Sequence, residues 1–168
     1  MSNRDAVKMS GDEVEAFLRG AKKVQVATVN PDGSPHLSTL FYVVRDGQIA
    51  FWTYGKSQKI RNLERDPRIT CLVEDGEDYF ELRGVSISGR ATFVREHDEL
   101  LDLGTAVAMR MVDADDPAAL GEIGTSMVQK QALKRVGVVV SHDHVATWDH
   151  SKMLAGVAGG SDGQDGAR

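Results

Sequence analysis

The fold of this chain is decided by residues 24–68, VQVATVNPDGSPHLSTLFYVVRDGQIAFWTYGKSQKIRNLERDPR. Alternating apolar residues predict three consecutive strands, at residues 24–29, 36–44 and 48–54. Asn30-Pro31-Asp32-Gly33 and Asp46-Gly47 between them are typical turn sequences, because proline presets φ and glycine accepts a positive φ. A short helix is expected from Ser57 to the Asp66-Pro67 pair, since the residue before a proline is disfavoured in the α region. The stretch therefore predicts a β meander that leads into one helix.

Positive charge gathers at the start of this expected helix. Three cations surround the N-cap candidate Ser57: Lys56, Lys59 and Arg61. The free amide N–H groups and the dipole of a helix N-terminus both attract anions. Gly55 before the cap permits a close backbone approach, and the aromatic strand before it offers flat walls for a planar ring. We therefore expect a phosphate-binding site here, and the alternative is a surface helix whose charges lie in water.

The rest of the chain predicts three more strands and three more helices. Ser10-Gly11-Asp12-Glu13 has the pattern of a capping box and predicts a helix that ends near Gly20. The further strands are expected at residues 69–74, 79–94 and 136–147, and the further helices at 97–111 and from 116 toward 134. Gly84 and Gly89 inside a strand are typical of a bulge or a barrel bend. Six strands joined mostly by hairpins predict an α+β fold built on a closed or half-closed antiparallel barrel.

Size and composition limit the classes of protein. The 168 residues suggest one domain, expected at residues 1–154, with a disordered tail rich in Gly, Ser and Asp at 155–168. A net charge of −5 argues against a general nucleic-acid binder. The single cysteine, Cys71, excludes an intramolecular disulfide, and no apolar run is long enough to span a membrane. A cytoplasmic protein is expected.

Two other kinds of site were weighed against the anion site. Gly55-Lys56-Ser57 resembles the end of a P-loop, but that motif requires glycine where this chain has Ala50. His142 and His144 would share a face on one strand, followed by Asp149 and His150. Such a set suits zinc or iron chemically, but it lacks a well-placed third ligand. No metal is therefore expected.

Three motifs in this order resemble one known superfamily: VATV at 26–29, PDGSPH at 31–36 and KxRNLxRDPR at 59–68. They are similar to the flavin and deazaflavin oxidoreductases of the pyridoxamine 5′-phosphate oxidase-like split β-barrel superfamily. The third motif is most similar to members that use the deazaflavin coenzyme F420. The resemblance implies a six-stranded antiparallel split β-barrel with flanking helices, and a homodimer with the cofactor at the subunit interface.

The resemblance also implies where the cofactor binds. Lys59, with Ser57 and Lys56, would hold its phosphate, and the second and third strands would lie along its ring. The full set of expected cofactor-binding residues is Lys59, Ser57, Lys56, Arg61, Asn62, Thr39, Phe41, Ser38, Trp52 and Tyr54. The deazaflavin also carries an anionic tail, for which Arg19, Lys22 and Lys23 are candidates.

The implied activity is hydride transfer from reduced F420 to an electron-poor double bond of a small-molecule substrate. No catalytic residue is assigned, because the cofactor supplies the reactive atom. A proton must still reach the product, and Tyr54, Tyr79 and His36 are candidate donors. One alternative keeps the fold and replaces F420 by FMN. Another is a non-catalytic module that binds a cofactor or haem, in which His142 and His144 would matter.

Overall fold

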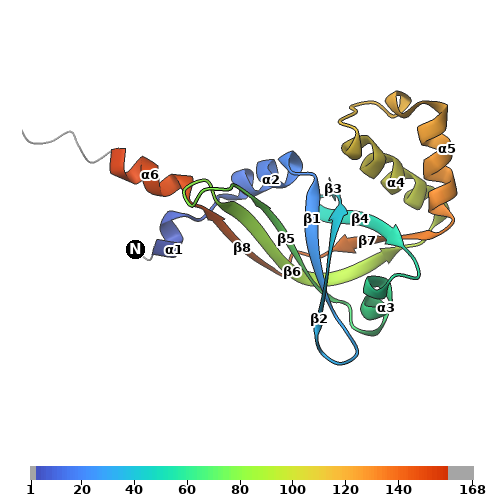
Figure 1. The fold of residues 1–168 in the computed structure, drawn as a ribbon, viewed down its shortest axis with the longest axis horizontal. Helices are drawn as coiled ribbons and strands as arrows, with labels where there is room; N and C mark the ends of the chain where they lie inside the picture. Colours follow the sequence, from blue (N-terminus) through green and yellow to red (C-terminus); the bar gives the residue numbers. More distant parts are fainter. Residues whose placement is uncertain (1–2, 159–168) are drawn as a thin grey trace, which may run out of the picture.

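The computed structural model describes residues 3–158, with the side chains of residues 5–154 (Figure 1). This part of the chain has eight strands: β1 (Lys23–Val29), β2 (Pro35–Phe41), β3 (Val43–Arg45), β4 (Gln48–Tyr54), β5 (Arg68–Asp75), β6 (Arg83–Val94), β7 (Arg135–Val140) and β8 (His144–Asp149). It also has six α-helices and one 3-10 helix: α1 (Asn3–Ala6), α2 (Gly11–Gly20), α3 (Gln58–Arg65), α4 (His97–Met111), η1 (Pro117–Leu120), α5 (Gly121–Ala132) and α6 (Ser151–Ala158). The α+β class is confirmed.

The strands form one antiparallel sheet in the order β2-β1-β5-β6-β7-β4-β3, and β8 pairs with β6. The two ends of this order, β2 and β3, follow each other in the chain with only Tyr42 between them. Because one residue joins the two edges, the sheet must curl back on itself. The result is the curled half-barrel expected from the sequence, with helices around it (Figure 1).

The strand count of six is wrong, and Tyr42 is one reason. The expected second strand is divided at this residue into β2 and β3. The Tyr42 side chain is fully buried, and its hydroxyl donates to the carbonyl oxygen of Leu18 at 2.6 Å. Its backbone N–H donates to the carbonyl of Lys22 at 3.2 Å, which continues the pairing of Phe41 with Lys23 by one residue before the chain passes to β3 and β4. Alternation of apolar residues continues across this point, so the sequence pattern alone shows no break.

The expected last strand is also divided, into β7 and β8. Both pair with the long strand β6, but the register shifts by one residue between Val140 opposite Ala91 and His144 opposite Ser88. Ser141 occupies the bulge, where its N–H donates to the carbonyl of Arg90 and its hydroxyl accepts from the N–H of Arg90. A Cβ atom at Gly89 would lie 1.8 Å from the carbonyl oxygen of Ser141. Gly89 therefore marks a bulge, as predicted.

Apolar side chains form two clusters on opposite faces of the sheet. The larger cluster fills the barrel interior and includes Phe51 of β4 and Ile60 of α3. The smaller cluster lies between the sheet and the α4–α5 insert and includes Trp52 of β4 and Leu103 of α4. Successive residues of a strand point to opposite faces, so β4 contributes to both clusters. This alternation decides which face each site residue reaches.

The α4–α5 insert differs in part from its expected form. Helix α4 has the predicted bounds, His97–Met111. The second expected helix is divided into η1 and α5 at Gly121, which has a φ of 61°. Asp116 caps η1 as predicted, because its side chain accepts from the N–H of Ala118 at 2.8 Å. The insert therefore consists of α4, η1 and α5, and it lies at the end of the molecule next to β3 and β4 (Figure 1).

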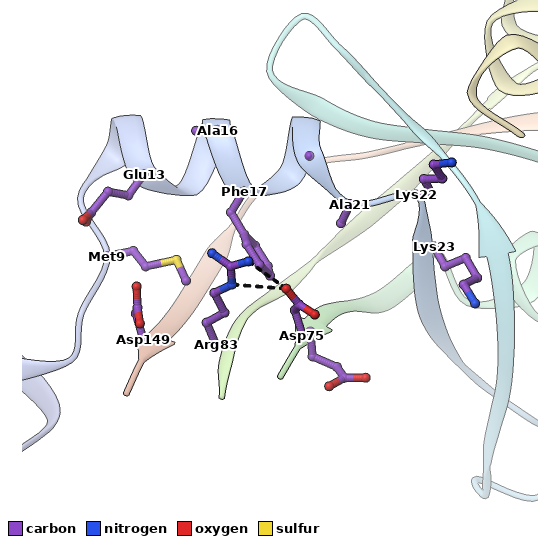
Figure 2. A pocket seen from close by; sticks show the side chains of 12 residues that line it. Met9, Glu13, Ala16, Phe17, Ala21, Lys22, Lys23, Asp75, Arg83 and Asp149 are labelled. Carbon is purple, nitrogen blue, oxygen red and sulfur yellow. Dashed lines mark hydrogen bonds and ion pairs between the residues drawn. The ribbon is translucent and has the colours of Figure 1, made fainter. Parts of the chain in front are cut away.

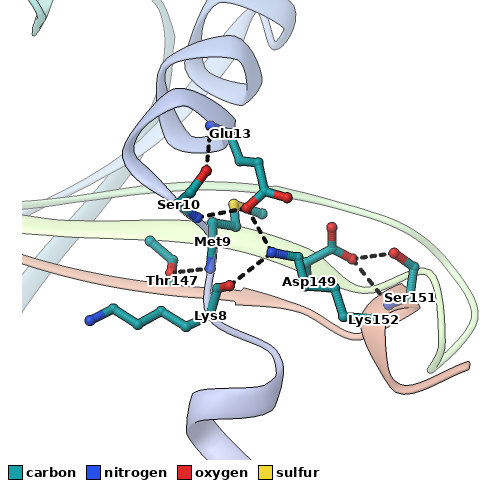
Figure 3. A network of polar contacts seen from close by, with 8 residues as sticks. All are labelled: Lys8, Met9, Ser10, Glu13, Thr147, Asp149, Ser151 and Lys152. Carbon is teal, nitrogen blue, oxygen red and sulfur yellow. Dashed lines mark hydrogen bonds and ion pairs between the residues drawn. The ribbon is translucent and has the colours of Figure 1, made fainter. Parts of the chain in front are cut away.

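The opposite end of the sheet is held by a polar network (Figure 3). Glu13 of α2 accepts from the N–H of Ser10 and from Lys152 of α6, both at 2.6 Å, which confirms the capping box. The N–H of Met9 donates to Thr147 of β8 at 3.0 Å. The segment before α2 is thereby joined to the end of the sheet.

Three further expectations concern the strand at residues 79–94, the C-terminal tail and membrane-spanning segments. Tyr79 was expected to begin a long strand, but that strand begins at Arg83 and Tyr79 lies in the turn before it. Helix α6 continues to Ala158, and the rest of the predicted tail lies outside the described residues. None of the described helices combines the length and the apolarity needed to cross a bilayer.

Candidate functional site

Helix α3 carries a buried cation near its N-terminus. Lys59 is only 9% exposed, although lysine is almost never buried without a partner. Its Nζ atom donates to Oγ1 of Thr53 at 3.4 Å, and no carboxylate lies within salt-bridge distance of it in the described part of the chain. Burial lowers the pKa of Lys59, and the nearby charge of Arg135 lowers it further. The site thus offers a desolvated positive charge that an anion would stabilise.

Ser57 occupies the N-cap position of α3, but its side chain does not cap the helix. Its Oγ atom is buried and has no hydrogen-bond partner among the described residues. The expectation of a side-chain cap is therefore wrong, because the hydroxyl makes no hydrogen bond to the amides of the first turn. The first turn of α3 contains no acidic residue. A buried hydroxyl without a partner next to a buried lysine suits the oxygen atoms of a phosphate.

The other predicted residues of α3 lie in different surroundings. Lys56 and Arg61 are exposed to solvent. Asn62 is fully buried, and its Nδ2 atom donates to Thr28 Oγ1 at 3.1 Å and to Asn30 Oδ1 at 2.9 Å. Its Oδ1 atom accepts from Gln58 at 2.9 Å. The hydrogen bonds of Asn62 thus connect α3 to the end of β1.

A mostly apolar pocket of about 400 Å³ lies on the other face of β4. Three predicted site residues line it: Thr39 and Phe41 of β2, and Trp52 of β4. Its remaining walls come mainly from the α4–α5 insert, with Val107 and Met127 as examples. The structure therefore brings β2 and β4 together around one cavity. The insert forms the rest of that cavity.

Ser38 and His36 do not share this pocket with their neighbours on β2. They alternate with Thr39, and they pair with the buried β1 residues Val26 and Thr28. Ser38 Oγ and His36 Nδ1 are buried without a hydrogen-bond partner among the described residues. Tyr54, at the end of β4, is 48% exposed. The predicted ring-binding residues are thus distributed over two faces of the sheet.

Arg135, at the start of β7, belongs to this region although sequence reasoning did not identify it. Its guanidinium carbon lies 4.8 Å from the centroid of the Trp52 ring, and its Nε atom donates to Gln131 at 3.1 Å. It is paired with Tyr54 across the β4–β7 ladder and lines the apolar pocket. Burial lowers the pKa of Arg135. No local motif marks this residue, because the long-range pairing of β7 with β4 places it here.

The cations expected to meet an anionic tail lie elsewhere. Lys22 and Lys23 line a separate pocket of about 760 Å³ between α2 and the ends of β5 and β6 (Figure 2). Lys22 forms an ion pair with Asp113, and Arg19 forms one with Glu15. In the same pocket the Arg83 guanidinium binds Asp75 and lies over the Phe17 ring. Two of the three tail candidates are therefore already paired within the chain.

The histidines do not form the expected strand face. His142 lies in the break between β7 and β8, where Nε2 accepts from the N–H of Ile49 at 3.4 Å. His144 lies on β8, and His150 contacts the turn at Tyr79. In the described part of the chain, no three His, Cys, Asp or Glu side chains are arranged to bind a metal. The turn between β5 and β6, to which Tyr79 belongs, lies at the end of the sheet away from α3 (Figure 1).

Comparisons with known proteins agree with this fold. Residues 10–148 match the family model described as pyridoxamine 5′-phosphate oxidase. A conserved hypothetical protein of Mycobacterium tuberculosis is 36% identical, with a TM-score of 0.81 over 99% of this chain and 98% of its own. An F420 reductase is 22% identical, with a TM-score of 0.59 over 78% of this chain and 94% of its own. A haem-storage protein of Vibrio cholerae is 20% identical, with a TM-score of 0.60 over 84% and 97%.

The last two structures share the fold, and at such low identity they show nothing more. None of the curated proteins compared with the chain matches it. The family match extends over most of the chain, including β1 to β8 and the α4–α5 insert. This chain therefore belongs to the pyridoxamine 5′-phosphate oxidase family and to its split-barrel superfamily.

Proposed function

We propose that this protein is an F420-dependent reductase that transfers a hydride to an electron-poor small molecule. The observation that carries the proposal is that, among the described residues, Lys59 is buried without a carboxylate partner and Ser57 Oγ, two residues earlier in the chain, is buried without a hydrogen-bond partner. The superfamily to which the chain belongs includes F420- and flavin-binding oxidoreductases. The 59–68 motif favours the deazaflavin over FMN. Both cofactors carry a phosphate, so FMN is the second candidate.

The residues present fit such a cofactor. Lys59 Nζ and Ser57 Oγ would hold the phosphate, and the backbone amides at the start of α3 would add donors. Trp52 and Phe41 would supply flat apolar walls near the ring, and Thr39 a hydroxyl at the edge of β2. Asn62 would act as a positioning residue, because its hydrogen bonds fix α3 against β1. When bound, reduced F420 supplies the hydride.

The chain must also allow a proton to reach the reduced product. Of the three candidate donors, Tyr79 lies at the far end of the sheet and is not proposed further. Tyr54 shares the face of Trp52 and Arg135 and is open to solvent, so it could relay a proton from water. His36 faces the barrel interior. We therefore favour Tyr54 or solvent as the proton source.

We further propose that the enzyme is a cytoplasmic homodimer. Leu37 on the outer face of β2 is 69% exposed, and it lies two residues from Thr39 in the pocket wall. A partner subunit that covers this face would remove Leu37 from water. It would also complete the walls around a ring bound along β2.

The proposal is tested by titrating the purified protein with F420 and, separately, with FMN, following the fluorescence of each ring. Saturable binding of F420, together with hydride transfer to an electron-poor acceptor in steady state, is the expected result. Binding of FMN alone would replace F420 by the second candidate. Failure to bind either molecule would contradict the proposed function. F420 binding without any hydride transfer would point to a non-catalytic module.

A further inference from the structure

Arg135 places one positive charge in an otherwise apolar cavity. The pocket is lined by fourteen residues, and Arg135 is its one charged member. The guanidinium lies over the Trp52 ring at 4.8 Å and donates from Nε to Gln131. No carboxylate of the described residues lies within salt-bridge distance of it. The side chain is therefore held in place without its charge being neutralised.

A cation without an anionic partner destabilises the free protein, and a bound anion would compensate for its charge. Taking a charge out of water is unfavourable unless an opposite charge or good hydrogen bonds compensate for it. The Trp52 face and the amide of Gln131 compensate in part and fix the orientation of the planar fork. The terminal N–H groups of Arg135 make no hydrogen bond within the described chain. A carboxylate matches that fork in shape and charge.

The walls of the pocket restrict the rest of the ligand. Trp52 and Phe41 come from the sheet, and Val107, Met111 and Met127 come from the insert. A cavity of about 400 Å³ is large enough for a fused two-ring molecule, and few polar groups line it. Flat aromatic and flexible methionine side chains favour a planar apolar body.

We propose that this pocket binds planar, conjugated carboxylates, with Arg135 binding the carboxylate. Where the proposed function holds, on which this assignment of a substrate class rests, these molecules are the substrates that the reduced cofactor meets, and they share the Trp52 and Phe41 walls with the cofactor ring. Arg135 is then the residue that selects acids over neutral molecules of the same shape. Lys59, on the α3 side of β4, serves the cofactor phosphate and not the substrate.

The test uses 2-naphthoate and its neutral counterpart 2-naphthamide as probes, and measures their binding to the full chain by calorimetry. The wild type should bind the acid at least about tenfold more tightly than the amide. Arg135→Gln should weaken binding of the acid by roughly ten- to a hundred-fold, as expected for lost hydrogen bonds to a charged group, and leave the amide unchanged. Arg135→Lys keeps the charge but loses the planar guanidinium group. Its affinity for the acid should lie between those of the wild type and Arg135→Gln.

Arg83→Gln is the matched control, because Arg83 also lies over an aromatic ring, at 5.3 Å from Phe17, but is paired with Asp75. It should leave the preference for the acid unchanged. Equal affinities for the two probes in the wild type would overturn the proposal. So would an Arg135→Gln variant that melts like the wild type, still prefers the acid and loses affinity for F420. A preference for the acid in a protein that fails to bind F420 would instead overturn the proposed function and leave the pocket assignment in place.

Discussion

Lys59 is a buried cation and Arg135 a partly buried one, and the chain surrounds them with different chemistry. Lys59 lies among hydroxyl groups at the start of α3, with Thr53 as its partner and Ser57 nearby. Arg135 lies on the Trp52 ring in an apolar pocket formed by the insert. The first environment suits a compact anion with many oxygen atoms. The second suits a planar molecule that carries one charged group.

The two regions are joined through neighbouring residues of one strand. Trp52 and Thr53 follow each other on β4 and point to opposite faces of the sheet. The positive charge of Arg135 also lowers the pKa of Lys59, after the larger effect of burial. A molecule with an anionic tail at α3 and a ring near Trp52 would therefore follow the end of β4.

Replacing Trp52 should cause the largest loss of stability, because it removes the contact between the sheet and the α4–α5 insert. Its side chain is 7% exposed and belongs to the cluster that holds α4 and α5 on the sheet. Trp52→Ala should lower the free energy of unfolding by about 3–5 kcal/mol, through lost burial and the cavity left behind. Urea unfolding followed by circular dichroism measures this loss. Trp148→Ala provides the comparison, since Trp148 is half-buried on β8 and should cost less. Equal losses would contradict the assignment of Trp52 to this core.

Replacing Asn62 should damage the α3 side instead. The substitution Asn62→Ala removes both hydrogen bonds to the end of β1 and leaves the buried hydroxyl of Thr28 without this donor. We expect a loss of about 1–3 kcal/mol of unfolding free energy, the usual cost of buried groups left unpaired. Cofactor affinity should fall as well, because α3 is less firmly held. A variant with full stability and full affinity would show that Asn62 does not position the helix.

The contact between the insert and the sheet can be tested at one glycine. A Cβ atom at Gly104 of α4 would lie 2.5 Å from Cζ3 of Trp52. Gly104→Ala should therefore destabilise the fold by about 1–2 kcal/mol, although alanine is the better helix former. The matched control is Gly20→Ala in α2, where no atom lies within 4 Å of the added Cβ. That variant should be neutral or slightly more stable. A stabilised Gly104→Ala protein would mean that the helix lies further from Trp52.

The two regions also differ in how much of them can be predicted from sequence. The α3 side is encoded locally: Gly55, Ser57, Lys59 and the Asp66-Pro67 stop lie in one short stretch, so propensity and charge suffice to find them. Even there the missing side-chain cap at Ser57 and the burial of its hydroxyl are not visible in the sequence. Arg135 reaches Trp52 only because β7 pairs with β4. A single sequence gives no sign of that pairing.

The strand count was missed for the same reason. The break at Tyr42 depends on a hydrogen bond to Leu18 in a helix that precedes β1. The break at Ser141 depends on close contact with Gly89 of another strand. Apolar alternation continues through Tyr42, and the polar residues 141–144 contain no glycine or proline, so the sequence predicts a continuous strand in each case. The curled shape was nevertheless predictable, because these breaks do not change the hairpin connections between the strands.

The charge of Lys59 should appear in the pH dependence of stability without a cofactor. Its pKa is below the ordinary value of 10.5 because burial disfavours the charged form. Between the folded pKa and 10.5, the unfolded chain binds a proton that the folded chain does not, so stability rises with pH. Lys59→Met lacks this titration. The free energy of urea unfolding of Lys59→Met should exceed that of the wild type by the largest amount near neutral pH. This difference should shrink as the pH approaches 10.5. A constant difference would contradict a desolvated lysine.

The most direct test of the central claim compares two lysines three residues apart. Lys59 is buried and Lys56 is exposed, although both surround the start of α3. In fluorescence titrations with F420, Lys59→Ala should weaken binding by roughly ten- to a hundred-fold, as expected for a lost charged contact. Lys56→Ala should weaken it by less than about fivefold, because exposed charges contribute little. Unchanged affinity in Lys59→Ala, in a protein that melts like the wild type, would show that this buried cation does not bind the cofactor.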